Sequence, residues 1–327
     1  MKQTVNLLLT STGKRTKLLE YFKKELRGEG NLIAVDCSAL APSLYIADEH
    51  YIVPTIDSAG YMDVIKEICK KEEISAVISL IDPELSLLSK YSGDLKRLGI
   101  SSIVSPFDVC ELWLDKYEVS KFCSNNGFKY AKTYNSFEVF QAALEREEVF
   151  FPVFIKPQKG SASFNIHLAR NIEEAKFIFQ YSSEMIIQEF LDGQELGVDV
   201  YVDLISKKVV SIFIKEKLVM RAGETDKAKS IKSEELFNLI EELVMKAGFI
   251  GPIDIDVFFI NGEYYISEIN PRFGGGYLLA YECGVNFPKF IINNLKGIVN
   301  KVQIGNYEEN VYMMRHDILT IKKFIEN

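Results

Sequence analysis

The chain has 327 residues, of which 47% are hydrophobic and 26% are charged. This composition is typical of a globular protein of about two domains, and it excludes wholesale disorder. The 38 basic and 46 acidic side chains give a net charge of −8. That balance argues against a general nucleic-acid or anionic-membrane binder, but it leaves room for a local basic pocket that binds a nucleotide.

The apolar runs are short. Residues 5–9 and 149–155 are the longest, far below the roughly 20 residues that cross a bilayer. The N-terminal run stops at Thr10 and enters a polar loop, which favours a strand over a signal peptide. The five cysteines are scattered, without a CxxC motif, and indicate reduced thiols of a cytoplasmic protein.

The first hundred residues alternate between strands and helices. Strands are predicted at 5–10, 32–36, 76–80 and 100–104, with a helix at 59–69 among the connections. Such alternation implies a parallel sheet with right-handed crossovers, in a small Rossmann-like domain that ends near Pro106. No GxGxxG motif follows the first strand, so a dinucleotide site is not predicted.

The rest of the chain changes to an α+β pattern. Helices are predicted at 111–123, 172–179 and 233–246, and strands at 149–156, 185–190, 197–204 and 208–215. Two further strands, 254–260 and 263–269, form a hairpin across Asn261–Gly262, which is a strong two-residue turn signal. The expected fold class is therefore α/β followed by α+β.

The hairpin region 251–276 reads GPIDIDVFFINGEYYISEINPRFGGG. Strand alternation and the tight turn bring Asp256 beside Glu268, with Asn270 on the same face as Glu268. Two carboxylates and an amide oxygen suit Mg²⁺, and Arg272 suits a developing phosphate charge. The alternative is a solvated hairpin with exposed acids.

The string EINPRFGGG, with an acid twelve residues before its glutamate, resembles the metal-binding hairpin of the ATP-grasp family. The chain is most similar to single-unit relatives of the carbamoyl-phosphate synthase large subunit, and the resemblance covers essentially its whole length. It implies a Rossmann-like pre-ATP-grasp domain over 1–110, a nucleotide-clasping subdomain over 111–187, and a C-terminal ATP-grasp subdomain with the metal site over 188–327.

The resemblance also implies site residues. Asp256, Glu268 and Asn270 would hold Mg²⁺, with Mn²⁺ as an alternative, and Arg272 would stabilise the transition state that forms an acyl phosphate. In PVFIKPQKGSASFNI, a lysine precedes a Gly/Ser loop, an arrangement that suits phosphate binding. The implied ATP contacts there are Lys156 and the loop residues Gly160, Ser161 and Ser163.

Three further segments follow the family's order. Lys116, in LDKYEV, resembles the first phosphate lysine, although alone it is one helix lysine. The segment MIIQEFLDGQELGVD resembles the adenine hinge and the ribose-binding acid. The implied residues are Gln188, Glu189, Phe190, Leu191 and Glu195, the last of which could also be a plain surface charge.

The segment IKEKLVMRAGETDKAKSI predicts a basic strand and loop. In this third segment, the resemblance implies that Lys215 faces the nucleotide and that Arg221 contacts the γ-phosphate or acyl phosphate as a catalytic residue. For Lys217, Lys227 and Lys229, a solvated loop is an equal alternative. In the N-terminal domain, Asp82 and Glu84 could recognise an amine, but helix capping by Asp82 is an equal alternative.

The resulting hypothesis is an ATP-dependent ligase that activates a small carboxylate as an acyl phosphate and joins it to an amine, or to a thiol. It implies ATP and Mg²⁺ as cofactors, small-molecule substrates, no nucleic acid, no membrane, a cytoplasmic location and, as in much of the family, a homodimer. Two alternatives stay open: one half of a split carbamoyl-phosphate synthase, and a non-catalytic ATP-binding regulatory protein.

Overall fold

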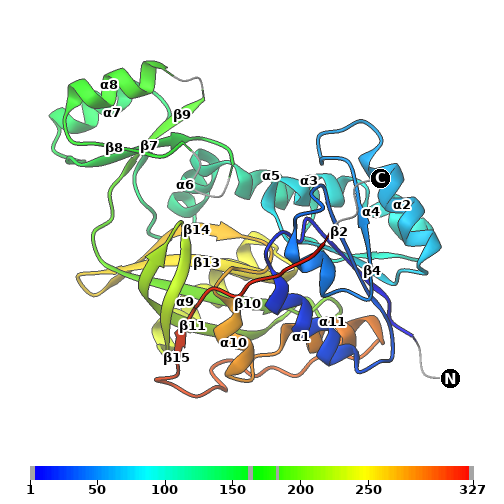
Figure 1. Cartoon of the computed structure of the whole chain (residues 1–327). Coiled ribbons are helices and arrows are strands. Elements are labelled where there is room, and N and C mark those ends of the chain that lie inside the picture. The colour runs from blue at the N-terminus through cyan, green and yellow to red at the C-terminus, as the bar shows by residue number, and fades with distance from the viewer. Residues whose placement is uncertain (1–3, 161–164, 182–183, 324–327) are drawn as a thin grey trace.

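The computed structural model describes residues 4–160, 165–181 and 184–323, which form three β-sheets with helices around them (Figure 1). The N-terminal sheet has the order β3-β2-β1-β4-β5, and all four pairings are parallel. Its strands are β1 (Leu7–Thr10), β2 (Leu32–Asp36), β3 (Glu49–Ile52), β4 (Ala76–Ser79) and β5 (Ser101–Ser102).

Helices cover both faces of this parallel sheet. Every residue of β1, β2 and β4 is buried, as expected for strands covered on both sides. The helices are α1 (Thr16–Leu26), α2 (Tyr61–Lys71), α3 (Asp82–Lys90) and α4 (Ser92–Arg97), with a 3₁₀ turn, η1 (Pro42–Tyr45). The predicted Rossmann-like sheet is confirmed, and the unpredicted β3 is a mostly exposed edge strand.

The helix predicted at 111–123 is two helices, α5 (Phe107–Leu114) and α6 (Lys116–Asn125). The break falls at Asp115, whose backbone is extended and whose carboxylate accepts hydrogen bonds from the amides of Tyr117 and Glu118. An aspartate in this capping position starts a new helix. Lys116 is therefore the first residue of α6.

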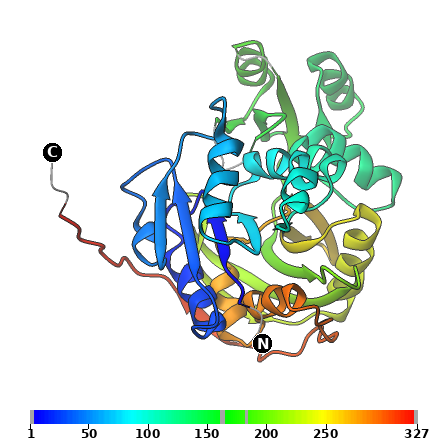
Figure 2. The ribbon, with the colours of Figure 1, turned by 90° about the vertical axis from the view of Figure 1, so that its right-hand side faces the viewer.

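A four-stranded sheet of order β6-β9-β7-β8 forms a separate lobe with α7 (Phe137–Glu145) and α8 (Ile172–Tyr181), seen at the top of Figures 1 and 2. Its strands are β6 (Thr133–Tyr134), β7 (Val153–Pro157), β8 (His167–Ala169) and β9 (Met185–Glu189). The lobe has its own small core around Phe140 and Val153.

The third sheet is antiparallel, with the order β14-β13-β10-β11-β12-β15. Its strands are β10 (Gln194–Val202), β11 (Val209–Arg221), β12 (Glu224–Ile231), β13 (Gly251–Ile260), β14 (Glu263–Asn270) and β15 (Tyr312–Met314). The accompanying helices are α9 (Glu234–Ala247), α10 (Tyr277–Glu282) and α11 (Phe287–Leu295).

The loop expected at Arg221–Gly223 is the turn of a hairpin, but the loop alternative for Lys227 and Lys229 is wrong. Residues Glu224–Ile231 form β12, which pairs with β11 on one side and β15 on the other. The sequence ETDKAKSI has few strand-forming residues, but Thr225, Ala228 and Ser230 alternate as buried positions between charged ones. Pairing on both sides thus outweighs weak local propensity.

The N-terminal domain packs on the C-terminal part of the chain. Helix α1 lies against α11, and the rings of Tyr21 and Tyr281 stack with centroids 3.7 Å apart. Both phenols donate across the contact, Tyr21 to Glu282 and Tyr281 to Glu25. Within the described ranges, no helix is long and apolar enough to cross a membrane.

Candidate functional site

The β13–β14 hairpin carries the predicted metal ligands. Asp256 lies opposite Glu268, and Asp254 lies opposite Asn270. The alternation of burial along β13 places Asp254 and Asp256 on the face opposite the fully buried Ile255 and Val257. No cluster of three or more His, Cys, Asp or Glu side chains spaced for a metal ion occurs in the described parts of the chain. A metal here would be held by two carboxylates and an amide oxygen.

Lys217 contacts one member of this set. Its Nζ is 2.7 Å from Asp256 Oδ1 and 2.8 Å from Glu195 Oε1, and its side chain is only 5% exposed. Burial favours the neutral amine, but the two carboxylates outweigh it and raise the pKa of Lys217 above its ordinary value. An ammonium group thus contacts one predicted metal ligand, so a cation fits at Asp256.

A glycine makes this contact possible. Lys217 is on β11 and Asp256 is on β13, so the lysine side chain must cross the intervening strand β10. It crosses at Gly197, where an added Cβ would lie 2.8 Å from Lys215 Cε and 3.2 Å from Lys217 Cε. Gly197 pairs directly with both Lys215 and Asp256. Because Gly197 has no side chain, the lysine side chains can pass over β10 at this position.

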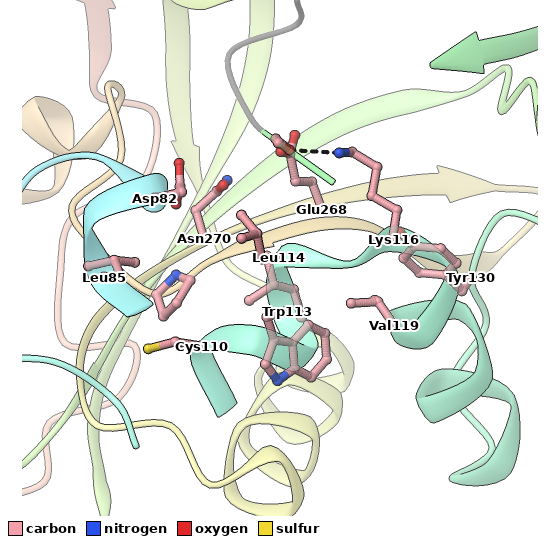
Figure 3. A pocket seen from close by; sticks show the side chains of 13 residues that line it. Asp82, Leu85, Cys110, Trp113, Leu114, Lys116, Val119, Tyr130, Glu268 and Asn270 are labelled. Atoms are coloured by element: carbon pink, nitrogen blue, oxygen red, sulfur yellow. Dashed lines mark hydrogen bonds between the residues drawn. The ribbon is translucent and has the colours of Figure 1, made fainter. Parts of the chain in front are cut away.

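A pocket lies beside the hairpin (Figure 3). The side chains of Asp82, Asn270 and Glu268 line one side with their polar ends pointing the same way, and Lys116 reaches in from α6. Lys116 Nζ donates to the carbonyl of Gly160 at 2.7 Å. Leu85, Cys110, Trp113, Leu114, Val119 and Tyr130 form the apolar part of the lining.

Two lysines that the sequence predicts to bind phosphate share this neighbourhood. Lys156 lies on β7, and burial lowers its pKa to about 8, with Glu268 raising it and Lys116 lowering it further. Burial also lowers the pKa of Lys116. Both amines are therefore desolvated and close to each other, a state that a phosphate anion would relieve.

The hinge residues join the two antiparallel sheets, because β9 belongs to one and β10 to the other. Gln188 is buried and donates to Thr133, while the carboxylate of Glu189 accepts from the amide of Lys132. The ring of Phe190 is 5.3 Å from that of Phe154, and Leu191 follows it in the connection.

The structure does not bring Lys215 or Arg221 to this pocket. Lys215 is 1% exposed and pairs with the equally buried Asp199 at 2.5 Å. Arg221 is at the far end of β11, 66% exposed, and lies 3.5 Å from Asp317. Ser161 and Ser163 fall outside the described residues. Lys217, two positions along the same strand, is the lysine that contacts the predicted ribose and metal ligands, Glu195 and Asp256.

Arg272 joins the hairpin to the N-terminal domain. It donates to Asp82 at 2.8 Å and lies 3.4 Å from Asp254. Glu84 is fully engaged, because it accepts from Ser11, Ser79 and Tyr61. Asp82 makes no capping bond for α3, so the capping alternative is wrong.

Sequence reasoning underrated Lys217 and passed over Asp254 as a site residue. A signal for Lys217 existed: Gly197 stands inside a strand, between Leu196 and Val198, and a glycine within a strand marks a close approach. The position of Asp254 on the same face as Asp256 was visible, but its arginine partner is fixed only by the tertiary fold.

A lysine pair, a connection between two antiparallel sheets and a two-carboxylate hairpin, with Lys116 and Glu268 lining one pocket, agree with the ATP-grasp class of nucleotide-binding protein. A family model described as an ATP-grasp domain matches residues 114–276, and one described as a PylC-like N-terminal domain matches residues 7–103. The chain is an ATP-grasp protein with a PylC-like N-terminal domain.

The chain is also similar to carbamoyl-phosphate synthases and to a D-alanine–D-alanine ligase. The chain is 25% identical over 299 residues to a carbamoyl-phosphate synthase of Methanobrevibacter smithii, covering 85% of this chain and 77% of the relative. It is 22% identical to the carbamoyl phosphate synthase large chain of Helicobacter pylori over 77% of this chain, but spans only 25% of that relative. A D-alanine–D-alanine ligase of Sulfurimonas denitrificans is 25% identical, with 72% of this chain and 73% of the relative covered.

Among solved structures, the fold is similar to the biotin carboxylase domain of Hydrogenobacter thermophilus 2-oxoglutarate carboxylase, crystallised with MgADP, ADP and bicarbonate. The TM-score is 0.74 at 16% identity, with 95% of this chain and 74% of that chain covered.

Proposed function

We propose that the protein is an ATP-dependent ligase that activates a carboxylate as an acyl phosphate and joins it to an amine. The observation that carries this proposal is the pocket in which Lys116, Glu268 and Asn270 meet beside Asp82 of the N-terminal domain. It offers phosphate-binding cations at one end and an interdomain space for a small substrate at the other. The similarity to a D-alanine–D-alanine ligase supports the same reaction class.

Asp256, Glu268 and Asn270 fit Mg²⁺, because their oxygens are brought together by strand register and one already contacts an ammonium group. Mg²⁺, or Mn²⁺ in its place, would supply charge neutralisation of the nucleotide phosphates. The MgADP complex of the biotin carboxylase domain supports this assignment.

The chain's own residues position the substrates and neutralise the charge of the phosphates. Lys116 and Lys156 hold phosphate oxygens, and Lys217 is a third cation within reach of Glu195, the proposed ribose acid. A substrate carboxylate oxygen then attacks the γ-phosphorus of ATP, ADP leaves, and Arg272 stabilises the charge on the acyl phosphate. The amine attacks the acyl carbon, its proton is lost, and phosphate departs. Such chemistry depends mainly on positioning and electrostatics.

Around the nucleotide, we propose adenine binding at the hinge formed by Glu189, Phe190 and Leu191, with Gln188 holding the hinge in place through Thr133. In this proposal a bound nucleotide extends from the hinge, at its adenine end, to the desolvated lysines, at its phosphate end. Gly160 would bring its backbone close to the phosphates, because it has no side chain. Its φ of +114° is an angle that residues with a Cβ rarely adopt.

The proposed function predicts that Glu268→Gln abolishes ATP turnover while leaving the fold intact, because it removes one charged metal ligand without changing size. ADP release is measured over paired carboxylates and amines, with the melting temperature as the check on folding. Glu263→Gln, at the exposed start of the same strand, is the matched control. Near-normal turnover in Glu268→Gln would refute the site.

A second candidate, half of a split carbamoyl-phosphate synthase, is favoured by the similarity to the Methanobrevibacter smithii protein. It predicts ATP hydrolysis that depends on bicarbonate and needs no amine or other carboxylate. We also propose the division at 1–110, 111–187 and 188–327, a homodimeric state and a cytoplasmic location. The division is supported by one sheet centred in each part, and the cytoplasmic location by five free cysteines.

A further inference from the structure

Two guanidinium groups converge on one backbone carbonyl. Arg15 Nη1 donates to the oxygen of Phe273 at 2.9 Å, and Arg272 Nη1 donates to the same oxygen at 3.0 Å. Arg15 comes from the turn that follows β1 in the N-terminal domain, and Arg272 comes two residues after Asn270. Two cations from segments 257 positions apart in the sequence therefore meet next to the predicted metal ligand.

The two arginines differ in their charge partners. Arg272 is neutralised by Asp82 and Asp254. Arg15 has no carboxylate within 4 Å in the ranges that the structure describes, although its neighbour Lys14 pairs with Glu224. Burial, followed by repulsion from Arg272, lowers the pKa of Arg15 to about 10, although attraction from Asp254, Glu224 and Asp82 partly offsets both effects. An anion beside Arg15 would relieve both effects.

The same place holds an unused acceptor. Asp82 Oδ2 is taken by Arg272, but Asp82 Oδ1 is buried and has no hydrogen-bond partner in the described chain. Buried polar atoms without partners are uncommon in native proteins, and a carboxylate oxygen calls for a hydrogen-bond donor, from the amine substrate or an ordered water. Asp82 lines the pocket together with Glu268 and Asn270 (Figure 3), so its free oxygen lies at the proposed reaction site.

We propose that Arg15 is a substrate-binding residue: together with Arg272 it holds the carboxylate that ATP activates. This inference rests on the proposed function and gives the N-terminal domain a direct part in it. The planar fork of a guanidinium matches a carboxylate, and two forks can bind both of its oxygens. The position after Asn270 brings the carboxylate next to the metal ligands, where it can reach the γ-phosphate.

A purely structural reading treats Arg15 as a tie between the N-terminal domain and the hairpin. That role needs one hydrogen bond to Phe273, which Arg15 makes with one nitrogen. It does not account for a half-buried guanidinium beside a second one, with no carboxylate within 4 Å among the described residues. The two readings differ in what they predict for ligand binding.

The test uses the full chain with saturating MgADP and four probes: acetate, glycine, bicarbonate and inorganic phosphate. Binding is measured by calorimetry and by the shift in melting temperature. At least one carboxyl-type probe is expected to bind the wild type. Arg15→Met should weaken it at least about tenfold, the loss of one charge-assisted contact, while the Kd of MgADP is unchanged. Arg15→Lys, which keeps the charge but not the fork, should give an intermediate loss.

Lys14→Met is the matched control, because Lys14 also joins the N-terminal domain to the ATP-grasp part but its side chain is 69% exposed. It should leave probe binding unchanged. The proposal is overturned if no carboxyl-type probe binds the wild type, if phosphate alone binds, or if Arg15→Met and Arg15→Lys both bind as the wild type does. Failure of the wild type to bind MgADP would overturn the proposed function itself, and this proposal with it. If Arg15→Met does not fold, the comparison of Arg15→Lys with Lys14→Met decides.

Discussion

Lys217 forms a buried ion pair in which the acid is a proposed metal ligand. The lysine is 5% and Asp256 is 22% exposed; Asp256 depends on Lys217 for its charge partner, whereas Lys217 has Glu195 as a second partner. Removing one member of such a pair costs more than the pair itself contributes, since it leaves a charge without compensation. Mg²⁺ arriving at Asp256 must therefore compete with, or displace, this ammonium group.

Lys217→Met is expected to lower the free energy of unfolding by about 2–3 kcal/mol, somewhat less than for a fully buried pair. Added Mg²⁺ should then raise the melting temperature of the variant more than that of the wild type, because no ammonium competes for Asp256. Thermal unfolding with and without MgCl₂ measures both. Lys121→Met, which removes an exposed pair on α6, is the control. If Mg²⁺ raised the melting temperatures of Lys217→Met and the wild type equally, competition between Mg²⁺ and Lys217 for Asp256 would be contradicted.

Lys156 predicts a pH dependence of nucleotide binding. Its pKa of about 8 in the free protein means that the amine loses its proton above pH 8, whereas bound phosphates would keep it charged. ATP affinity should therefore weaken as pH rises, approaching roughly tenfold per pH unit between pH 8.5 and 10. Lys156→Arg stays charged and should flatten this slope. A wild-type Kd that is constant up to pH 10 would show that Lys156 does not contact the phosphates.

At the scale of elements, strand β10 matters because two lysine side chains pass over it at Gly197. Gly197→Ala places a Cβ within 2.8 Å of Lys215 and 3.2 Å of Lys217, so one or both must move. We expect a loss of about 1–3 kcal/mol in the free energy of unfolding and weaker Mg²⁺ binding. Denaturant unfolding measures the first and calorimetry the second.

Gly93→Ala is the matched control for Gly197→Ala. Gly93 lies in α4, has no neighbour within 4 Å of an added Cβ and has ordinary backbone angles, so alanine there should be neutral or stabilising. If Gly197→Ala were as stable as Gly93→Ala and bound Mg²⁺ as well as the wild type, the passage over β10 would have no functional role.

Most elements were predictable because their patterns are local. The parallel sheet follows from buried runs such as Leu32–Asp36, and the β13–β14 hairpin follows from Asn261–Gly262. The turn also fixed which acids face each other, so Asp256 and Glu268 could be paired from the sequence. Strand β12 was missed, because its pairing with β15 comes from residues about 85 positions later.

The site was predictable only where one motif holds the residues together. The choice between Lys215 and Lys217 depends on which lysine finds Asp199 and which finds Asp256, and both acids lie on other strands. Arg221 lies in a segment that resembles a family motif, yet the long β11–β12 hairpin places it away from the pocket. Arg15 and Phe273 come together only in the folded chain.

At the scale of the molecule, hydrophobic cores divide the chain unequally. One core cluster contains residues of the N-terminal sheet and of the six-stranded sheet, whereas the lobe around β7 and β9 has a small core of its own. Segments with few shared contacts open separately and at lower free energy. The lobe is therefore the part expected to move when nucleotide binds.

Hydrogen exchange checks this expectation. Peptides from β7 and β9 should exchange faster than those from β10 and β13, and MgADP should slow the lobe most, because the lobe supplies Lys156 and the hinge. Exchange of β9 at the same rate as β13, with or without nucleotide, would show that the molecule opens as one unit.

The contacts between α1 and the C-terminal helices have a consequence for synthesis of the chain. Tyr21, Glu25 and Arg15 meet partners 256 to 261 positions later. Domains generally begin to fold as they leave the ribosome. Here the side of α1 that faces away from the N-terminal sheet stays uncovered until the last sixth of the chain has emerged. A ribosome that stalls before residue 273 would hold a protein with an exposed apolar face and no carboxylate site, a natural client for a chaperone.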